Sequence, residues 1–107
     1  MGKLVRDLIP KIIKDSGMEP VTRVISEEEY REKLFEKLIE EARELRDAQD
    51  NEHRIEELAD VLEVVEAITM HFEISTQSVQ DKKLSKNLER GGFALRIVLD
   101  GVNPKSD

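Results

Sequence analysis

Residues 26–72 read SEEEYREKLFEKLIEEARELRDAQDNEHRIEELADVLEVVEAITMHF, and this stretch decides the fold. Its apolar side chains recur every three or four residues, which is the spacing of one helix face. The first run consists of Tyr30, Leu34, Leu38, Ala42 and Leu45. The second, which we expect to form a buried face, consists of Ile55, Leu58, Ala59, Leu62, Val65 and Ile68. Two consecutive helices follow from this pattern.

Capping signals set the limits of these helices. Ser26 followed by Glu29 is a capping-box pattern, and Asp50 or Asn51 can cap the second helix. We therefore predict one helix from about Glu27 to Ala48 and another that runs to about Phe72.

The flanking sequence adds shorter elements. Residues 4–14 carry an apolar stripe that contains Pro10, which either kinks a helix or lies in the first turn of a shorter one that Asp7 caps. A third long helix is expected from Ile74-Ser75 to just before Gly91. Residues 21–25 are β-branched and residues 93–99 are largely apolar, so both predict minor β segments. The expected fold class is all-α: an antiparallel helical bundle of three long helices with a short N-terminal helix.

Size and composition predict one small domain spanning residues 1–107, with a polar tail from about residue 100. Of the 107 residues, 32 are Leu, Ile, Val or Phe, and there is no Trp. This share exceeds the roughly 20% below which chains tend to be disordered, so a mostly aliphatic core is expected. A chain this short leaves much of its surface uncovered, which favours a homodimer or homotetramer.

Several classes of protein are excluded. The chain has no Cys, so disulfide scaffolds and thiol nucleophiles are ruled out, and no apolar run approaches a membrane span. The N-terminus lacks a signal-peptide block, which favours a cytoplasmic protein. The net charge is −7, and residues 27–66 alone carry −10, which argues against binding of duplex nucleic acid. A solvated acidic helix face would give the same charge distribution.

Two carboxylate clusters lie on the two best helices. The first is Glu40-Glu41-x-x-Glu44 and the second is Glu57-x-x-Asp60. Side chains three apart leave a helix on the same side, so an antiparallel arrangement lets the two pairs face each other. Converging carboxylates need cations, and Mg²⁺ or Mn²⁺, with coordination positions left for phosphate oxygens, suits them. Such pairs also arise by chance on solvated helix faces.

Other metal and catalytic patterns are missing from the sequence. A di-iron bundle needs Glu-x-x-His pairs, and neither His53 nor His71 is in such a pair. The sequence contains no Walker loop, dinucleotide fingerprint or Ser-His-Asp arrangement.

The carboxylate pattern resembles the signature of the MazG-like all-α nucleoside triphosphate pyrophosphatase superfamily, which includes phosphoribosyl-ATP pyrophosphohydrolase. The segments Lys3-Leu4-Val5-Arg6-Asp7-x-Ile9-Pro10 and Glu89-Arg90-Gly91-Gly92-Phe93 are similar to those of a compact single-domain branch. The resemblance implies that Glu41, Glu44, Glu57 and Asp60 bind Mg²⁺, with Mn²⁺ as a substitute. It also implies that Glu40 orients or deprotonates water that attacks the α-phosphate of a nucleoside triphosphate.

The resemblance leaves other points open. Family members bind phosphates with basic residues of the last helix, and the candidates here are Lys82, Lys83, Lys86 and Arg90; the last three share a face. A solvated basic face would look the same. The implied reaction yields a nucleoside monophosphate and pyrophosphate, in nucleotide-pool house-cleaning. The alternatives are hydrolysis of another pyrophosphate compound, such as a phosphoribosyl-nucleotide, a non-catalytic nucleotide- or metal-binding module, and a purely structural bundle with acidic faces.

Overall fold

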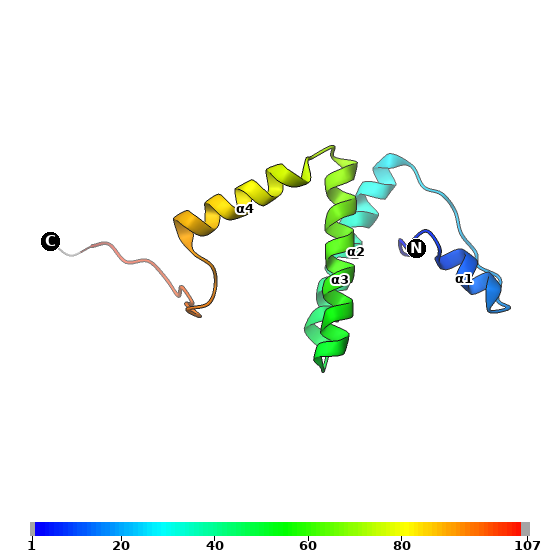
Figure 1. Cartoon of the computed structure of the whole chain (residues 1–107), viewed down its shortest axis with the longest axis horizontal. Coiled ribbons are helices and arrows are strands. Elements are labelled where there is room, and N and C mark those ends of the chain that lie inside the picture. The colour runs from blue at the N-terminus through cyan, green and yellow to red at the C-terminus, as the bar shows by residue number, and fades with distance from the viewer. Residues whose placement is uncertain (1, 106–107) are drawn as a thin grey trace. The chain divides into compact units, whose positions relative to one another are not determined.

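Four helices make up the regular secondary structure of the computed structural model, which describes residues 2–105 (Figure 1). They are α1 (Ile9–Asp15), α2 (Glu27–Asp47), α3 (Asn51–His71) and α4 (Thr76–Arg90). The chain divides between Ile74 and Ser75 into two compact units, one with α1 to α3 and one with α4. The expected all-α class is confirmed, and the assignment of residues 1–107 to one domain stays a prediction.

Helices α2 and α3 form an antiparallel pair, joined by the three residues 48–50 (Figure 1). Both begin where the capping signals predict. The Ser26 hydroxyl accepts a hydrogen bond from the backbone N–H of Glu29 at 3.2 Å. The Asp50 carboxylate accepts one from the N–H of His53 at 2.8 Å. These side chains satisfy backbone donors that have no partner within the helix, so they fix both helix starts.

The apolar core between these two helices is small. Leu34, at 1% exposure, and Val64 are the buried apolar side chains of the described residues. The predicted buried face of α3 is wrong for the single chain, because Ile55, Leu58, Leu62 and Val65 all remain exposed. Helix α3 carries apolar side chains on more than one face, and one neighbouring helix covers only part of its circumference.

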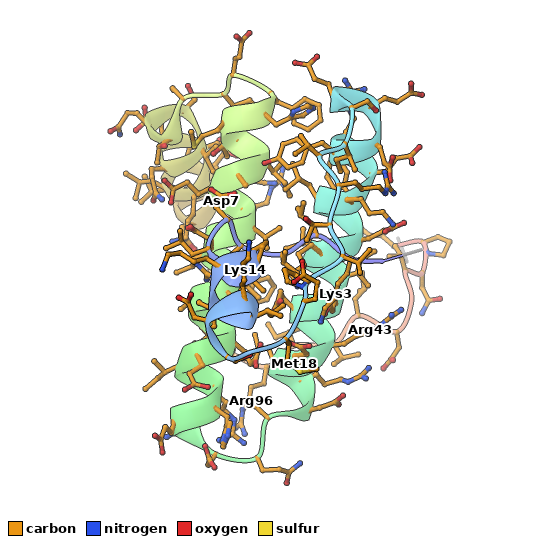
Figure 2. The ribbon with its side chains drawn as sticks, turned by 90° about the vertical axis from the view of Figure 1, so that its right-hand side faces the viewer. Lys3, Asp7, Lys14, Met18, Arg43 and Arg96 are labelled. Atoms are coloured by element: carbon orange, nitrogen blue, oxygen red, sulfur yellow. The ribbon has the colours of Figure 1, made fainter. Side chains whose placement is uncertain are left out.

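The N-terminal segment, residues 2–8, and α1 complete the first unit. Pro10 lies in the first turn of α1, as the shorter-helix alternative predicts. Asp7 does not cap this helix, because the N-cap residue is Leu8 and makes no side-chain cap. The backbone N–H of Ile9 donates a hydrogen bond to the Arg6 carbonyl, so the chain turns just before the helix begins. Asp7 lies in this turn, one residue before the N-cap position. Figure 2 shows the N-terminal segment lying over the α2–α3 pair, with Lys3 towards α2 and Asp7 towards α3.

Both predicted β segments are wrong. Residues 21–25 are irregular, and Val21 is 98% exposed. Residues 93–99 begin with a turn, in which the backbone N–H of Arg96 donates a hydrogen bond to the Phe93 carbonyl. Arg96 takes a φ of +59° there. β-branched sequences favour strands only where a neighbouring strand can pair with them, and neither segment has one within residues 2–105.

Helix α4 begins and ends as the sequence predicts. Ser75 caps its N-terminus by accepting a hydrogen bond from the N–H of Ser78 at 3.0 Å. The helix stops at Gly91, whose φ of +78° is a conformation that favours glycine. From residue 100 the described tail has no regular structure.

Candidate metal centre

Three of the predicted acidic residues converge next to the α2–α3 connection. Glu41 and Glu44 lie one turn apart near the end of α2, and Glu57 lies in the second turn of α3. One carboxylate oxygen from each lies within 4.8 Å of the other two. Because α2 and α3 are antiparallel and their connection is short, residues thirteen apart in sequence come together here. We refer to Glu41, Glu44 and Glu57 as the acid cluster.

The burial of Glu41 makes this cluster different from an acidic surface patch. Glu41 is only 5% exposed, and its Oε1 lies 3.3 Å from the ammonium nitrogen of Lys37. Its Oε2 has no hydrogen-bond partner among residues 2–105, and the same is true of Oε2 of Glu57. Buried polar atoms normally have partners, and a buried charge is costly without compensation. The hard oxygen donors and the two unpartnered oxygens could therefore hold a metal cation that prefers oxygen ligands.

The pKa values of the cluster respond to this crowding. Desolvation is the main cause that raises the pKa of Glu57 to about 7, and the adjacent carboxyl groups of Glu41 and Glu44 add to it. Desolvation and Glu41 also raise the pKa of Glu44. Burial and crowding therefore favour a proton on the metal-free cluster, which a bound cation would displace.

The other two predicted site acids form ion pairs with basic side chains. Asp60 accepts a hydrogen bond from Nη2 of Arg6 at 2.7 Å. Glu40 lies 3.4 Å from the ammonium groups of both Lys3 and Lys37. The structure thus joins Glu41, Glu44 and Glu57 in one cluster and places Asp60 and Glu40 in ion pairs.

Sequence reasoning did not pair the surrounding basic residues with these acids. Lys37 was detectable, because it precedes Glu41 by four residues on the same helix and so faces it. Lys3 and Arg6 were not detectable as neighbours of these acids, because 37 and 54 residues separate them from their partners.

A cavity of about 220 Å³ adjoins the acid cluster. Leu4 and Val5 of the N-terminal segment form one side of it, and Leu34 and Val64 contribute from α2 and α3. Glu41 and Asp60 both line this cavity, together with Lys37 and Arg6. A ligand in the cavity would therefore reach predicted metal ligands from α2 and α3.

The predicted phosphate-binding residues Lys83, Lys86 and Arg90 lie on α4, in the second unit. Their regular helical spacing places them on one face, as the sequence indicates. Their role in binding phosphate stays a prediction.

Comparisons with known proteins find a partial relative. An uncharacterized protein from Mycolicibacterium smegmatis is 46% identical over 56 residues, which cover 52% of this chain and 57% of that protein. The match thus spans little more than half of either protein. No family model matches the chain, and no solved structure matches it. Within residues 2–105, no helix combines the length and apolar character needed to cross a membrane.

Proposed function

We propose that this chain is a Mg²⁺-dependent nucleoside triphosphate pyrophosphohydrolase of the MazG-like type. The observation that carries the proposal is the convergence of Glu41, Glu44 and Glu57 around a buried, unpartnered oxygen of Glu41. An acidic surface patch would keep its carboxylates hydrated and apart. This cluster instead keeps them close together and partly desolvated, which suits a site that holds a cation.

Each acidic residue of the predicted site has a proposed role in the reaction. Glu41, Glu44, Glu57 and Asp60 would hold the cation, and Asp60 would have to exchange its ion pair with Arg6 for the cation. A bound cation would supply positive charge for the phosphate oxygens and would lower the pKa of nearby water. Glu40 accepts the proton of the water whose oxygen attacks the α-phosphorus. The bond from that phosphorus to the bridging oxygen breaks, and pyrophosphate leaves.

Pyrophosphate release tests this reaction. The wild-type chain is incubated with canonical and modified nucleoside triphosphates and Mg²⁺ or Mn²⁺, beside Asp60→Asn and Glu41→Gln. We expect pyrophosphate from the wild type and none from either variant. Glu36→Gln is a matched control, because Glu36 is an exposed residue of the same helix paired with Lys33.

Each other result points to a different conclusion. Full activity of Asp60→Asn would show that the metal-ligand assignment is wrong. Orthophosphate as the product would mean attack at the γ-phosphate. Metal binding without any product would favour another pyrophosphate substrate, such as a phosphoribosyl-nucleotide, or a non-catalytic binding module. The absence of metal binding would favour a structural helical protein.

The proposal includes a homo-oligomer, a homodimer or homotetramer, in which a second copy covers the exposed face of α3. Leu62 at the centre of this face is 68% exposed, and Ile55, Leu58 and Val65 lie beside it on the same helix. Within residues 2–105, two buried apolar residues are few for a chain that must offset its conformational entropy. The finer expectation, an antiparallel bundle that includes α4, is part of the same proposal.

Sedimentation analysis of the wild type and Leu62→Asp tests this assembly. We expect a dimer or larger species for the wild type and a lower mass for the variant, because an aspartate would have to be buried in the contact. A wild type that sediments as a single chain at micromolar concentration would contradict it.

A further inference from the structure

The N-terminal segment carries two basic residues that lie against acids of the predicted site. Arg6 contacts Asp60 on α3 at 2.7 Å and Glu63 at 3.6 Å. Lys3 contacts Glu40 on α2 at 3.4 Å. Figure 2 shows this segment over the α2–α3 pair, with Lys3 towards α2. The two basic residues lie three residues apart in the N-terminal segment and contact acids on two different helices.

Contacts on both sides of these residues position the segment. The ammonium group of Lys33 on α2 donates to the Gly2 carbonyl at 3.2 Å. Leu4 and Val5, between the two basic residues, line the cavity beside the acid cluster. The Arg6 carbonyl accepts a hydrogen bond from the N–H of Ile9 at the start of α1. These contacts hold the segment where Lys3 pairs with Glu40 and Arg6 pairs with Asp60.

The exposure of these ion pairs indicates that folding stability is a small part of their effect. The side chain of Arg6 is 53% exposed and that of Lys3 is 65% exposed. Solvent screens exposed pairs, so they contribute little to stability. A guanidinium that is half in solvent can exchange one oxyanion for another, and its planar fork fits phosphate oxygens as well as a carboxylate.

We infer that Arg6 and Lys3 bind the phosphate chain of the substrate at the mouth of the acid cluster. This inference rests on the proposed function. In the free protein Arg6 neutralises Asp60. A divalent cation held by Asp60 would displace Arg6 from this carboxylate, and the guanidinium would then be free to pair with phosphate oxygens. Since Lys3 and Arg6 lie against acids of different helices, the pair suits a chain of two or more phosphates better than a single phosphate group.

Calorimetric titration of the full chain with Mg²⁺ alone, and then with inorganic pyrophosphate at saturating Mg²⁺, tests this role. Arg6→Ala is expected to weaken pyrophosphate binding about tenfold or more, because it removes a charge-assisted hydrogen bond. Binding of Mg²⁺ alone is expected to stay the same or become tighter, since the competing cation at Asp60 is gone. Lys3→Ala should act in the same direction, and Arg6→Lys should lie between the wild type and Arg6→Ala.

Arg23→Ala is the matched control. Arg23 is also half-exposed and forms an ion pair, with Glu29 at 2.9 Å, but it does not line the cavity. This variant should bind both ligands as the wild type does. Circular dichroism of all variants establishes that the helices are intact.

Two results would overturn the inference. The first is pyrophosphate binding by Arg6→Ala that equals that of the wild type. The second is an equal loss of Mg²⁺ and pyrophosphate binding, which would assign Arg6 a structural role.

The failure of the proposed function can be distinguished from the failure of this inference. If pyrophosphate binding depends on Arg6 but no nucleotide is hydrolysed, the inference stands and the pyrophosphohydrolase assignment is wrong. If Arg6→Ala hydrolyses with the wild-type KM while Asp60→Asn is inactive, only the inference is wrong. A wild type that binds neither ligand overturns both.

Discussion

Replacing Glu41 by glutamine should stabilise the metal-free protein and, at the same time, remove its stabilisation by Mg²⁺. Glu41 is 5% exposed, and its Oε2 has no partner among the described residues. The amide of the variant keeps the size of the side chain and carries no charge. It also supplies N–H donors towards the nearby carboxylates of Glu44 and Glu57.

The size of the effect follows from these contacts. A buried polar group without a partner costs about 1–3 kcal/mol. The variant loses the pairing of Glu41 with Lys37, but Lys37 keeps its second partner, Glu40, at 3.4 Å. A net gain of about 1 kcal/mol remains, which raises the Tm of a domain of this size by about 4–8 °C. For the wild type, about a hundredfold excess of Mg²⁺ over its Kd adds about 2.7 kcal/mol, or about 10–20 °C.

Thermal unfolding followed by circular dichroism, in a chelator and then in millimolar Mg²⁺, measures both quantities. Glu41→Gln should melt above the wild type in the chelator and below it in Mg²⁺. Glu36→Gln, which changes an exposed carboxylate of the same helix, should follow the wild type in both conditions. A variant that melts lower in the chelator, or that keeps the full response to Mg²⁺, would refute the reasoning.

Three further predictions concern stability, pH and substrate binding. Leu34→Ala should lower the free energy of unfolding by about 2–5 kcal/mol, because it removes a fully buried side chain, whereas the exposed Leu84→Ala should change it little; urea unfolding measures both. The pKa of Glu57 is raised from 4.5 to about 7 in the folded chain, so the folded state binds the proton more tightly than the unfolded state. The metal-free Tm should accordingly fall as pH rises from about 4.5 to 7, and Glu57→Gln should flatten this slope in thermal scans. Lys86→Ala should raise KM with little change in kcat; steady-state kinetics with an unaltered KM would remove Lys86 from the phosphate site.

The helices were predictable because their signals are local. Ser26, Asp50 and Ser75 each cap the helix that follows, and each bonds a backbone N–H three residues later. The spacing within Glu41-x-x-Glu44 likewise places two carboxylates on one side of α2 before any tertiary contact forms. The convergence of Glu57 with them needed only an antiparallel pair with a short connection.

The features that sequence reasoning missed depend on partners distant in the chain. The β-branched residues 21–25 would form a strand only beside another strand, and the described chain offers none. The face of α3 that packs on α2 contains Val64, whereas the prediction placed Leu62 there. Apolar side chains lie on two faces of α3, and the sequence does not indicate which face contacts α2. Arg6 is 54 residues from Asp60, and no local pattern predicts their pairing.

The connection, residues 48–50, lies at the tip of the α2–α3 hairpin, beyond the acid cluster on both helices. One extra turn on each helix at this tip would lengthen the chain by about seven residues and restore the same rotational phase, because an α-helix repeats every 3.6 residues. The twelve residues between Glu44 and Glu57 can therefore grow in steps of about seven while the carboxylates still face one another. This tip is the position at which a peptide, a fluorescent reporter or a whole domain could be inserted without disturbing the cluster.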